Sequence, residues 1–380
     1  MNKQSHTKAS PNRRLRGMII KESLQIIRDP SSIAIAFIMP VVLLLLFGYG
    51  VSLDAKHVPV GLVIEQPDAV TASLAGSFAQ SEYFAPRPFH SIQEAETALK
   101  ERRIDGIIWL KNNFSEQLLN TKEPPIAVRV NGVDSNQANM TQGYIQGVWL
   151  TWLQHYAQSK GRSLQQAVQM EQRIWFNPAL SSTLFLVPGL IAIIMTLIGS
   201  MLTSMVVARE WDRGTMEAIL VTPLSSNEFL AGKLVPYFVL GMVSMLFTVA
   251  LAIWLFDVPM LGSFWILLLS SSLFMLVSLA IGLLISIVSK NQFVAGQISL
   301  VVTFLPAYML SGFIFDIHSM PAAIQLITHI VPARYFVAIL QTLFLAGDIW
   351  PVLLANMGAL LLMLFIFAVI VRKKSNNHLE

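Results

Sequence analysis

The most constraining feature of this chain is a set of six long apolar stretches whose cores carry no charged side chain. A helix needs about 20 apolar residues to cross a bilayer, and each stretch is near that length or longer. Hydrophobic residues make up 54% of the chain and charged residues only 13%, against roughly 25% charged in soluble domains. The sequence therefore predicts a polytopic α-helical membrane protein with six transmembrane helices, at 33–53, 179–207, 234–256, 264–289, 298–315 and 350–371.

Basic residues near the ends of these stretches predict the orientation in the membrane. Several lysines and arginines precede the first span, and with six spans Arg209, Arg213, Lys233 and Lys290 fall on the same side. Because cationic segments resist translocation, that side is expected to be the cytoplasm. The sequence pI of 9.3 then reflects topology, and no nucleic-acid partner is expected. The first span is too long for the apolar region of a signal peptide, so it is expected to stay as an anchor. The cytoplasmic segments are expected at 1–32, 208–233 and 372–380.

Residues 54–178 have the pattern of a soluble domain. Short β-rich runs alternate with helix-like segments, which favours a layer of sheet and helices. Strands are expected at 58–64, 104–110 and 126–130, and helices at 68–81, 92–103 and from 134 toward 174. Asp134 and Gln137 have the spacing of a capping box, and Asn177-Pro178 ends the last helix. The prediction is an extracytoplasmic (periplasmic) α/β domain between the first two spans, since long domains are translocated regardless of charge.

Catalytic, cofactor and metal motifs are not found. Gly232-Lys233 is followed by Leu234, so the Gly-x-x-x-x-Gly-Lys-Ser/Thr loop that binds the phosphates of ATP does not form. Neither a Gly-x-Ser-x-Gly elbow nor a His-Glu-x-x-His helix occurs, and the seven histidines lack ligand spacing. The polar cluster at 134–139 departs from a calcium loop, which favours a cap and turn. The chain is expected to be no enzyme, with no catalytic, cofactor or metal residues.

The composition of the spans bears on how a solute would be moved. Ion-coupled carriers place charged groups in the membrane core, and these spans have none, so coupling to an ion gradient is disfavoured. Thr196, Ser200 and Thr203 follow one another at helical spacing in the second span. Small and hydroxylated residues of this kind serve helix packing, and they also suit the wall of a solute path. Both interpretations stay open at this point.

A charged segment at 208–224 interrupts the apolar sequence between the second and third spans. It contains an Arg-Glu pair, a Gly-Thr pair, a Glu three residues past the Gly, and a closing Thr-Pro. In this order these residues resemble the cytoplasmic coupling helix of ABC-2-type transporter permeases. The resemblance implies that nine residues couple to a separate ATPase subunit: Arg209, Glu210, Trp211, Arg213, Gly214, Thr215, Glu217, Thr222 and Pro223. Trp211 departs from the family, where a further charged residue is common, and this bears on the choice of partner rather than on the fold.

The family resemblance extends over most of the chain. Further matches are Lys21-Glu22, Arg28-Asp29-Pro30, 133–136, 175–178, 310–312, 320–321 and Pro332. Together they resemble the multidrug-export subgroup of bacterial ABC-2 permeases in the inner membrane. That resemblance implies two subunits per pore, as a homodimer or a heterodimer with a related permease, and a separate ABC ATPase that binds ATP and Mg. It also implies extracytoplasmic re-entrant helices at 316–349. A periplasmic adaptor protein and membrane lipid are further expected partners.

If 208–224 were one helix, Trp211, Thr215, Ala218, Ile219 and Thr222 would share a face suited to docking. On this hypothesis Gly214 lies within the docked helix, while Glu210 and Glu217 face the partner. The alternative is an ordinary solvated loop. Residues 13–29 have the pattern of a basic amphipathic helix in the membrane interface, which would serve either as a second coupling element or as an anchor on anionic lipid.

The function predicted from these features is that of the permease subunit of an ATP-driven exporter for drugs or other amphiphiles. One alternative is a permease of the same architecture that exports lipid or glycan precursors. Family members for polysaccharides generally have a smaller external domain, which disfavours it. Another alternative is a membrane-anchored sensor or assembly scaffold, for which no cytoplasmic signalling domain is encoded.

Overall fold

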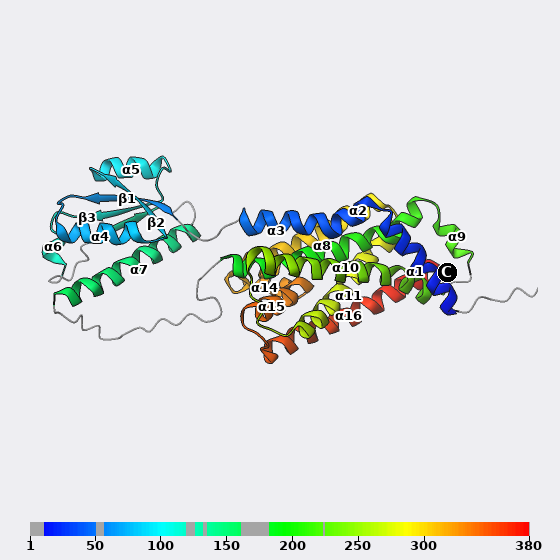
Figure 1. The fold of residues 1–380 in the computed structure, drawn as a ribbon. Coiled ribbons are helices and arrows are strands. Elements are labelled where there is room, and N and C mark those ends of the chain that lie inside the picture. The colour runs from blue at the N-terminus through cyan, green and yellow to red at the C-terminus, as the bar shows by residue number, and fades with distance from the viewer. Residues whose placement is uncertain are drawn as a thin grey trace, which may run out of the picture. The chain divides into compact units, whose positions relative to one another are not determined.

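The computed structural model describes residues 11–50, 57–118, 126–131, 135–160, 182–222 and 225–379. The chain divides into two compact units, one formed by Met1–Ser52 with Ile174–Glu380 and the other by Leu53–Arg173. The first unit is helical and the second contains a β-sheet (Figure 1). Pro223, Asp134 and the 175–178 motif lie outside the described residues.

The helical unit contains six helical segments that are long and apolar enough to cross a membrane. Their bounds are Pro30–Tyr49, Ser182–Asp212, Ser226–Phe256, Phe264–Ser289, Gln292–Leu310 and Trp350–Lys374. The chain is thus a largely helical, polytopic membrane protein, as the apolar stretches predicted. The third segment begins at Ser226, eight residues before the expected 234, because Ser225 and Glu228 form a capping box at its start.

These segments are built from the following elements. The N-terminal part comprises α1 (Pro11–Ile27), α2 (Pro30–Ile33), the π-helical η1 (Ala34–Ile38) and α3 (Met39–Tyr49). After the α/β unit come α8 (Ser182–Asp212), α9 (Met216–Leu220), α10 (Ser226–Phe256) and α11 (Phe264–Ser289). The last part comprises α12 (Gln292–Ser299), the π-helical η2 (Leu300–Phe304), α13 (Leu305–Leu310), the 3₁₀ turn η3 (Ile317–Ser319), α14 (Ala322–Thr328), α15 (Pro332–Leu345) and α16 (Trp350–Leu379).

Helix α8 is the centre of the helical unit. It is buried on all sides over most of its length, which is the pattern of a helix that is surrounded by other helices. Glycines let its neighbour α11 approach closely, since a β-carbon on Gly282 would collide with the backbone of Ser200. A β-carbon on Gly199 would in turn meet Ser278. Small residues at such contacts are what holds helices together in lipid, where no hydrophobic effect drives their association.

Helices α14 and α15 lie within the stretch expected to form re-entrant helices, and their axes differ by 83°. Pro332 is the first residue of α15, a position where its missing N–H and fixed φ cost nothing. By length and composition the bent pair would also serve as one broken span, which would make a seventh. A re-entrant arrangement at 316–349 stays a prediction.

The second unit contains a four-stranded sheet of order β2-β1-β3-β4. Strands β1, β2 and β3 are parallel, and β4 pairs antiparallel with β3. Helices α4 and α7 cover one face and α5 covers the other (Figure 1). In chain order the elements are β1 (Val58–Ile64), α4 (Ala69–Gln80), β2 (Phe84–Phe89), α5 (Ile92–Lys100), β3 (Gly106–Leu110), α6 (Phe114–Gln117), β4 (Ile126–Val130) and α7 (Ser135–Ser159).

Strand β2 is missing from the sequence-based expectation. Its sequence Phe-Ala-Pro-Arg-Pro-Phe contains two prolines, which argue against a central strand. The structure places β2 at the edge of the sheet, where prolines are tolerated because one side of the strand has no hydrogen-bonding neighbour.

Candidate coupling site

Residues 208–222 form two helices joined by a tight turn, so the expectation of one continuous docked helix was wrong. Helix α8 continues to Asp212, and α9 begins at Met216. Between them Gly214 has a φ of +66°. The Thr215 amide donates to the Glu210 carbonyl at 3.0 Å, and the Gly214 amide donates to the Trp211 carbonyl at 3.1 Å. This is the Schellman pattern that ends a helix at a glycine in the left-handed conformation.

The geometry explains why a glycine stands at position 214. A β-carbon there would meet no atom within 4 Å, so close backbone approach is not the reason. The positive φ is the reason, since other L-residues adopt it at a cost. The expected location of Gly214 inside a helix is corrected accordingly: it is the residue that ends α8 and turns the chain into α9.

The apolar side chains of this turn pack against the rest of the helical unit. Met216 is 2% exposed and belongs to a buried cluster with Met18 of α1, Phe229 of α10 and Leu283 of α11. Trp211 and Ile219 pack against the same cluster, whereas Ala218 and Thr222 are exposed. The residues expected to share one face of a single helix are therefore divided between the end of α8 and α9. Met216, the most buried residue of the turn, was not among the predicted site residues.

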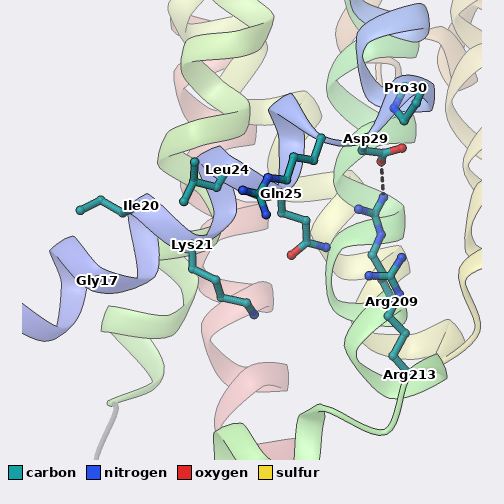
Figure 2. A pocket seen from close by; sticks show the side chains of 10 residues that line it. Gly17, Ile20, Lys21, Leu24, Gln25, Asp29, Pro30, Arg209 and Arg213 are labelled. Atoms are coloured by element: carbon teal, nitrogen blue, oxygen red, sulfur yellow. Dashed lines mark ion pairs between the residues drawn. The ribbon is translucent and has the colours of Figure 1, made fainter.

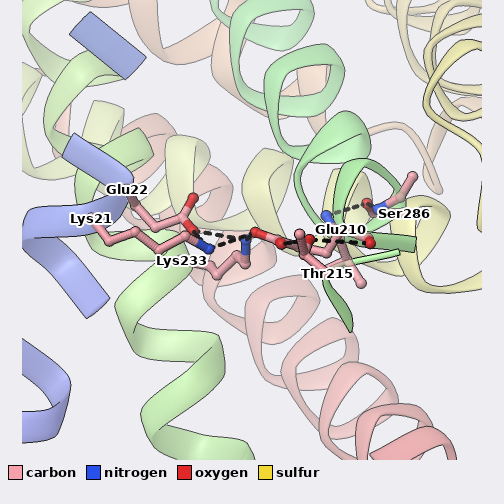
Figure 3. Close-up of polar contacts among 8 residues, drawn as sticks. Lys21, Glu22, Glu210, Thr215, Lys233 and Ser286 are labelled. Atoms are coloured by element: carbon pink, nitrogen blue, oxygen red, sulfur yellow. Dashed lines mark hydrogen bonds and ion pairs between the residues drawn. The ribbon is translucent and has the colours of Figure 1, made fainter. Parts of the chain in front are cut away.

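Glu210 is buried and forms the centre of a network of charged groups (Figure 3). Its carboxylate accepts from the ammonium groups of Lys233 at 2.7 Å and Lys21 at 2.8 Å, and from the Thr215 hydroxyl. Lys233 is 1% exposed and also donates to Glu22, at 2.8 Å. Two lysines and two glutamates thus balance one another, which burial of charge requires. The hypothesis that Glu210 faces an external partner is wrong, because its partners lie in α1 and α10.

A second ion pair joins the start of the first span to the end of the second. The Arg209 guanidinium lies 3.1 Å from the Asp29 carboxylate. Burial would raise the pKa of Asp29, but hydrogen bonds from Ser31 and Ser32 and the charge of Arg209 together hold it below its usual value. Asp29 is also the N-cap of α2. The predicted amphipathic helix at 13–29 is therefore observed as α1, and its end is fastened to α8.

Helix α1 is fastened at two more points. Arg14 pairs with Glu228 of α10 at 3.1 Å. Burial would lower the pKa of Lys21, but the hydrogen bond to Glu210 and the charges of Glu210 and Glu22 raise it above its usual value. Arg14 and Lys21 thus hold α1 against residues 208–233, the segment that the sequence predicted to be a cytoplasmic loop.

The end of α8 is also fixed to α11. The Ser286 hydroxyl accepts from the amides of Val207 and Ala208, each at 2.9 Å (Figure 3). The Lys290 ammonium lies 4.9 Å from the centre of the Trp211 ring. Trp211 thus has a cation–π partner within the chain.

Several of the remaining predicted coupling residues are accessible. Arg213, Glu217 and Thr222 are exposed on the turn and on α9. The predicted residues thus have different roles in the structure. Arg209 and Glu210 fix the turn to α1, α2 and α10, while the exposed residues of the turn and of α9 present a surface.

The hydroxyl residues of the second span lie beside a pocket of about 360 Å³ within the helical unit. Thr196 and Ser200 line it, together with Ser278 and Thr303, whereas Thr203 is not among its lining residues. The Ser200 and Thr303 hydroxyls lie 2.7 Å apart and join α8 to η2. Thr196, Ser200 and Thr203 also donate to carbonyls of their own helix. The hydrogen bonds of these hydroxyls are all made within the protein, as the helix-packing interpretation expects. Thr196 and Ser200 also border a space of solute size, so the solute-path interpretation stays open for these two residues.

Within the described residues, no group of three or more His, Asp or Glu side chains could hold a metal ion.

The helical unit thus contains several candidate membrane spans, and the second of them continues into a short turn that is fixed to α1 and α10. The chain belongs to the ABC-2 family of transporter proteins, whose family model matches residues 30–373. It is 42% identical to the "Probable multidrug ABC transporter permease YbhS" of Escherichia coli K12, over 97% of this chain and 98% of the relative. It is 27% identical to "Probable multidrug ABC transporter permease YbhR" of the same strain, over 90% of this chain and 94% of that one.

A further relative is the "Inner membrane transport permease YhhJ" of Escherichia coli K12, with 27% identity over 79% of this chain and 81% of the relative. The family model and the first two relatives cover most of the chain, including the α/β unit. Membership of the family makes the protein a membrane transport subunit, the permease of an ABC exporter, and implies an ABC ATPase as its partner.

Proposed function

We propose that this permease exports drugs or other amphiphiles across a bacterial inner membrane and that a separate ATPase subunit drives it. The multidrug permeases among its relatives support the substrate class. The single observation that carries the coupling mechanism is the position of Glu210. It lies at the end of the most buried span and is bonded to α1, to α10 and to the turn that leads into α9.

In this proposal the ATPase docks on α9 and the residues that follow it. Glu217 and Thr222 are available for contact, whereas Met216 and Ile219 hold the helix on the permease. A movement of α9 would displace Glu210, and Glu210 would carry α1 and α10 with it through Lys21 and Lys233. Two permease subunits, as a homodimer or a heterodimer, would alternate between inward- and outward-facing packings as rigid bodies.

The solute would pass the apolar pocket beside Thr196 and Ser200. Its wall is mostly aliphatic and aromatic, with a few hydroxyl groups from Thr196, Ser200, Ser278 and Thr303. Such a wall suits amphiphiles, which pair an apolar body with a few hydrogen-bonding groups. None of the described residues that line it is charged, whereas ion-coupled carriers place charged groups in the membrane core.

The proposed topology places both termini in the cytoplasm and the α/β unit in the periplasm. The basic residues of α1, of the α8–α9 turn and of the end of α16 support this orientation. The α14–α15 pair would then re-enter the membrane from the outer side. A periplasmic adaptor would find its contact surface on the α/β unit.

The experiment that tests the coupling proposal begins with the native complex. Mass spectrometry of the co-purified subunits identifies the ATPase, and hydrolysis is then measured in nanodiscs with and without the permease. Glu217→Lys should lower recovery of the ATPase in a pull-down and lower its stimulated hydrolysis. Glu82→Lys, which reverses an exposed charge on the α/β unit, should leave both unchanged. Wild-type recovery and stimulation with Glu217→Lys would show that α9 is not the docking element.

A further inference from the structure

The space between α1 and the end of α8 is an open pocket of about 850 Å³ (Figure 2). Lys21 and Gln25 point from α1 toward this space, and Arg209 and Arg213 line it from α8. With Arg28, four cationic side chains of the described residues line the pocket. Lys21 is already paired with Glu210 and Arg209 with Asp29, so Arg28 and Arg213 supply the excess positive charge.

Several of its donors have no partner within the described residues. Neither the Arg28 nor the Arg213 guanidinium has an ion pair or hydrogen bond there, and both side chains are accessible. Arg209 is 4% exposed, and its Nε is buried without an acceptor although another nitrogen of the same group pairs with Asp29. An anionic oxygen in the pocket would be attracted to this buried guanidinium, which Asp29 holds in place.

The ends of two candidate spans lie at the pocket, which is where the boundary between membrane and water is expected. Pro30, which lines it, is the first residue of the first candidate span, and Arg209 and Arg213 flank Asp212, the last residue of the second. The phosphate groups of the lipids occupy this depth. Cations of a membrane protein at this level meet an anionic leaflet surface.

An apolar strip lies beside the cations. Ile20, Leu24 and Ile27 follow one another on one face of α1 and are 49%, 48% and 68% exposed. Ile20 and Leu24 also line the pocket. Their exposure would be favourable in contact with hydrocarbon, as in a helix that lies in the membrane interface.

We infer that this pocket is a specific binding site for the phosphate headgroup of an anionic phospholipid whose acyl chains cover Ile20 and Leu24. The phosphate oxygens would accept from Arg28 and Arg213, and the charge of Arg209 at the pocket wall would add to the attraction. An acidic protein surface would match the cations but would leave the apolar strip in water, so the lipid fits both parts of the pocket. The site goes beyond a diffuse cationic anchor because Arg209, one of the residues that line it, is buried and held in place by Asp29.

The test measures lipid retention by the full chain in detergent, using native mass spectrometry. Phosphatidylglycerol is compared with phosphatidylcholine of the same acyl chains. The wild type should retain phosphatidylglycerol with about tenfold preference or more, since charge-assisted hydrogen bonds of this kind have that effect. Arg28→Gln should reduce the preference, and Arg28→Gln with Arg213→Gln should abolish it. Both arginines are exposed, so the fold should tolerate the changes.

The matched control is Arg372→Gln with Lys373→Gln, which removes two exposed cations from α16 outside the pocket. It should keep the preference. An equal loss in the control would show diffuse charge attraction and overturn the proposal. Complete displacement of the lipid by excess inorganic phosphate would show a site for the free anion alone. Unchanged lipid preference in the double variant, together with lost recovery of the ATPase subunit, would assign the pocket to a protein partner.

Discussion

The ammonium of Lys233 lies 2.7 Å from the carboxylate of Glu210, and this contact joins the first turns of α10 to the end of α8 inside the protein. Side chains of the two residues are 1% and 5% exposed. Neither charge could be buried alone, and Lys21 and Glu22 complete a neutral set of four. The contact therefore fixes the position of the turn that precedes α9 relative to three helices.

Removing one member of this set should unfold the helical unit more easily. Lys233→Met leaves two buried glutamates with one lysine, and breaking a buried pair in this way costs about 3–5 kcal/mol. Lys233→Met with Glu22→Gln leaves Lys21 paired with Glu210, so it should recover most of the loss. Thermal unfolding in detergent measures both. Arg14→Gln, at a more exposed pair, is the control and should cost about 0–1 kcal/mol. A double variant no more stable than the single one would contradict the charge-balance account.

Gly214 should respond to backbone conformation and not to side-chain size. Gly214→Ala is expected to cost about 1–2 kcal/mol because of the positive φ, and Gly214→Asn less, since asparagine enters this region more readily. Gly214→Trp should match alanine in the free permease, because the position faces open space. Unfolding measurements on the free permease test this expectation. If tryptophan lowers ATPase recovery far more than alanine does, the partner covers this turn; equal recovery would place the partner elsewhere.

The proposed topology makes a direct prediction for thiol labelling. The chain contains no cysteine, so single cysteines report one position each. Ala79→Cys on α4 and Ala218→Cys on α9 are both exposed positions. In intact spheroplasts a membrane-impermeant maleimide should modify the first and spare the second until the membrane is opened. Labelling of both before opening would refute the placement of α9 in the cytoplasm.

Asp68 should make the start of α4 sensitive to acid. Its carboxylate accepts from the Ser115 hydroxyl and from the amides of Thr71 and Val70, which lowers the pKa of Asp68 below its usual value. A lowered pKa in the folded state means that the cap stabilises fully above about 3.9, the ordinary value, and is lost as the pH falls through the folded-state pKa. Hydrogen exchange of the α4 amides, corrected for intrinsic rates, should show this loss.

Asp68→Asn supplies the control for that experiment, because asparagine also caps helices but does not titrate. Its α4 protection should be insensitive to pH over the same range. An identical acid-induced loss in this variant would mean that a different group is responsible.

The sequence by itself determined the elements whose formation depends on neighbouring residues. A run of about 20 apolar residues has few options other than a membrane-spanning helix, so the six spans follow from composition and length. Hydrophobic periodicity likewise indicated the amphipathic helix that became α1 and several elements of the α/β unit. The start of α10 at Ser225 and Glu228 and the turn at Gly214 also carry local signals, a capping box and a helix-ending glycine, and both could have been identified from the sequence.

Only the tertiary structure decided what these elements do together. Glu22, Glu210 and Lys233 lie far apart in sequence, and no local pattern shows that a charge near a span end will be buried against another. The formation of strand β2 also depended on the tertiary structure, because its prolines are acceptable only at the sheet edge that it occupies. Whether Glu210 faces a partner or the protein interior depends on how α1, α8 and α10 pack. Packing of that kind is a property of contacts between distant segments, and the sequence specifies it only through the folded chain.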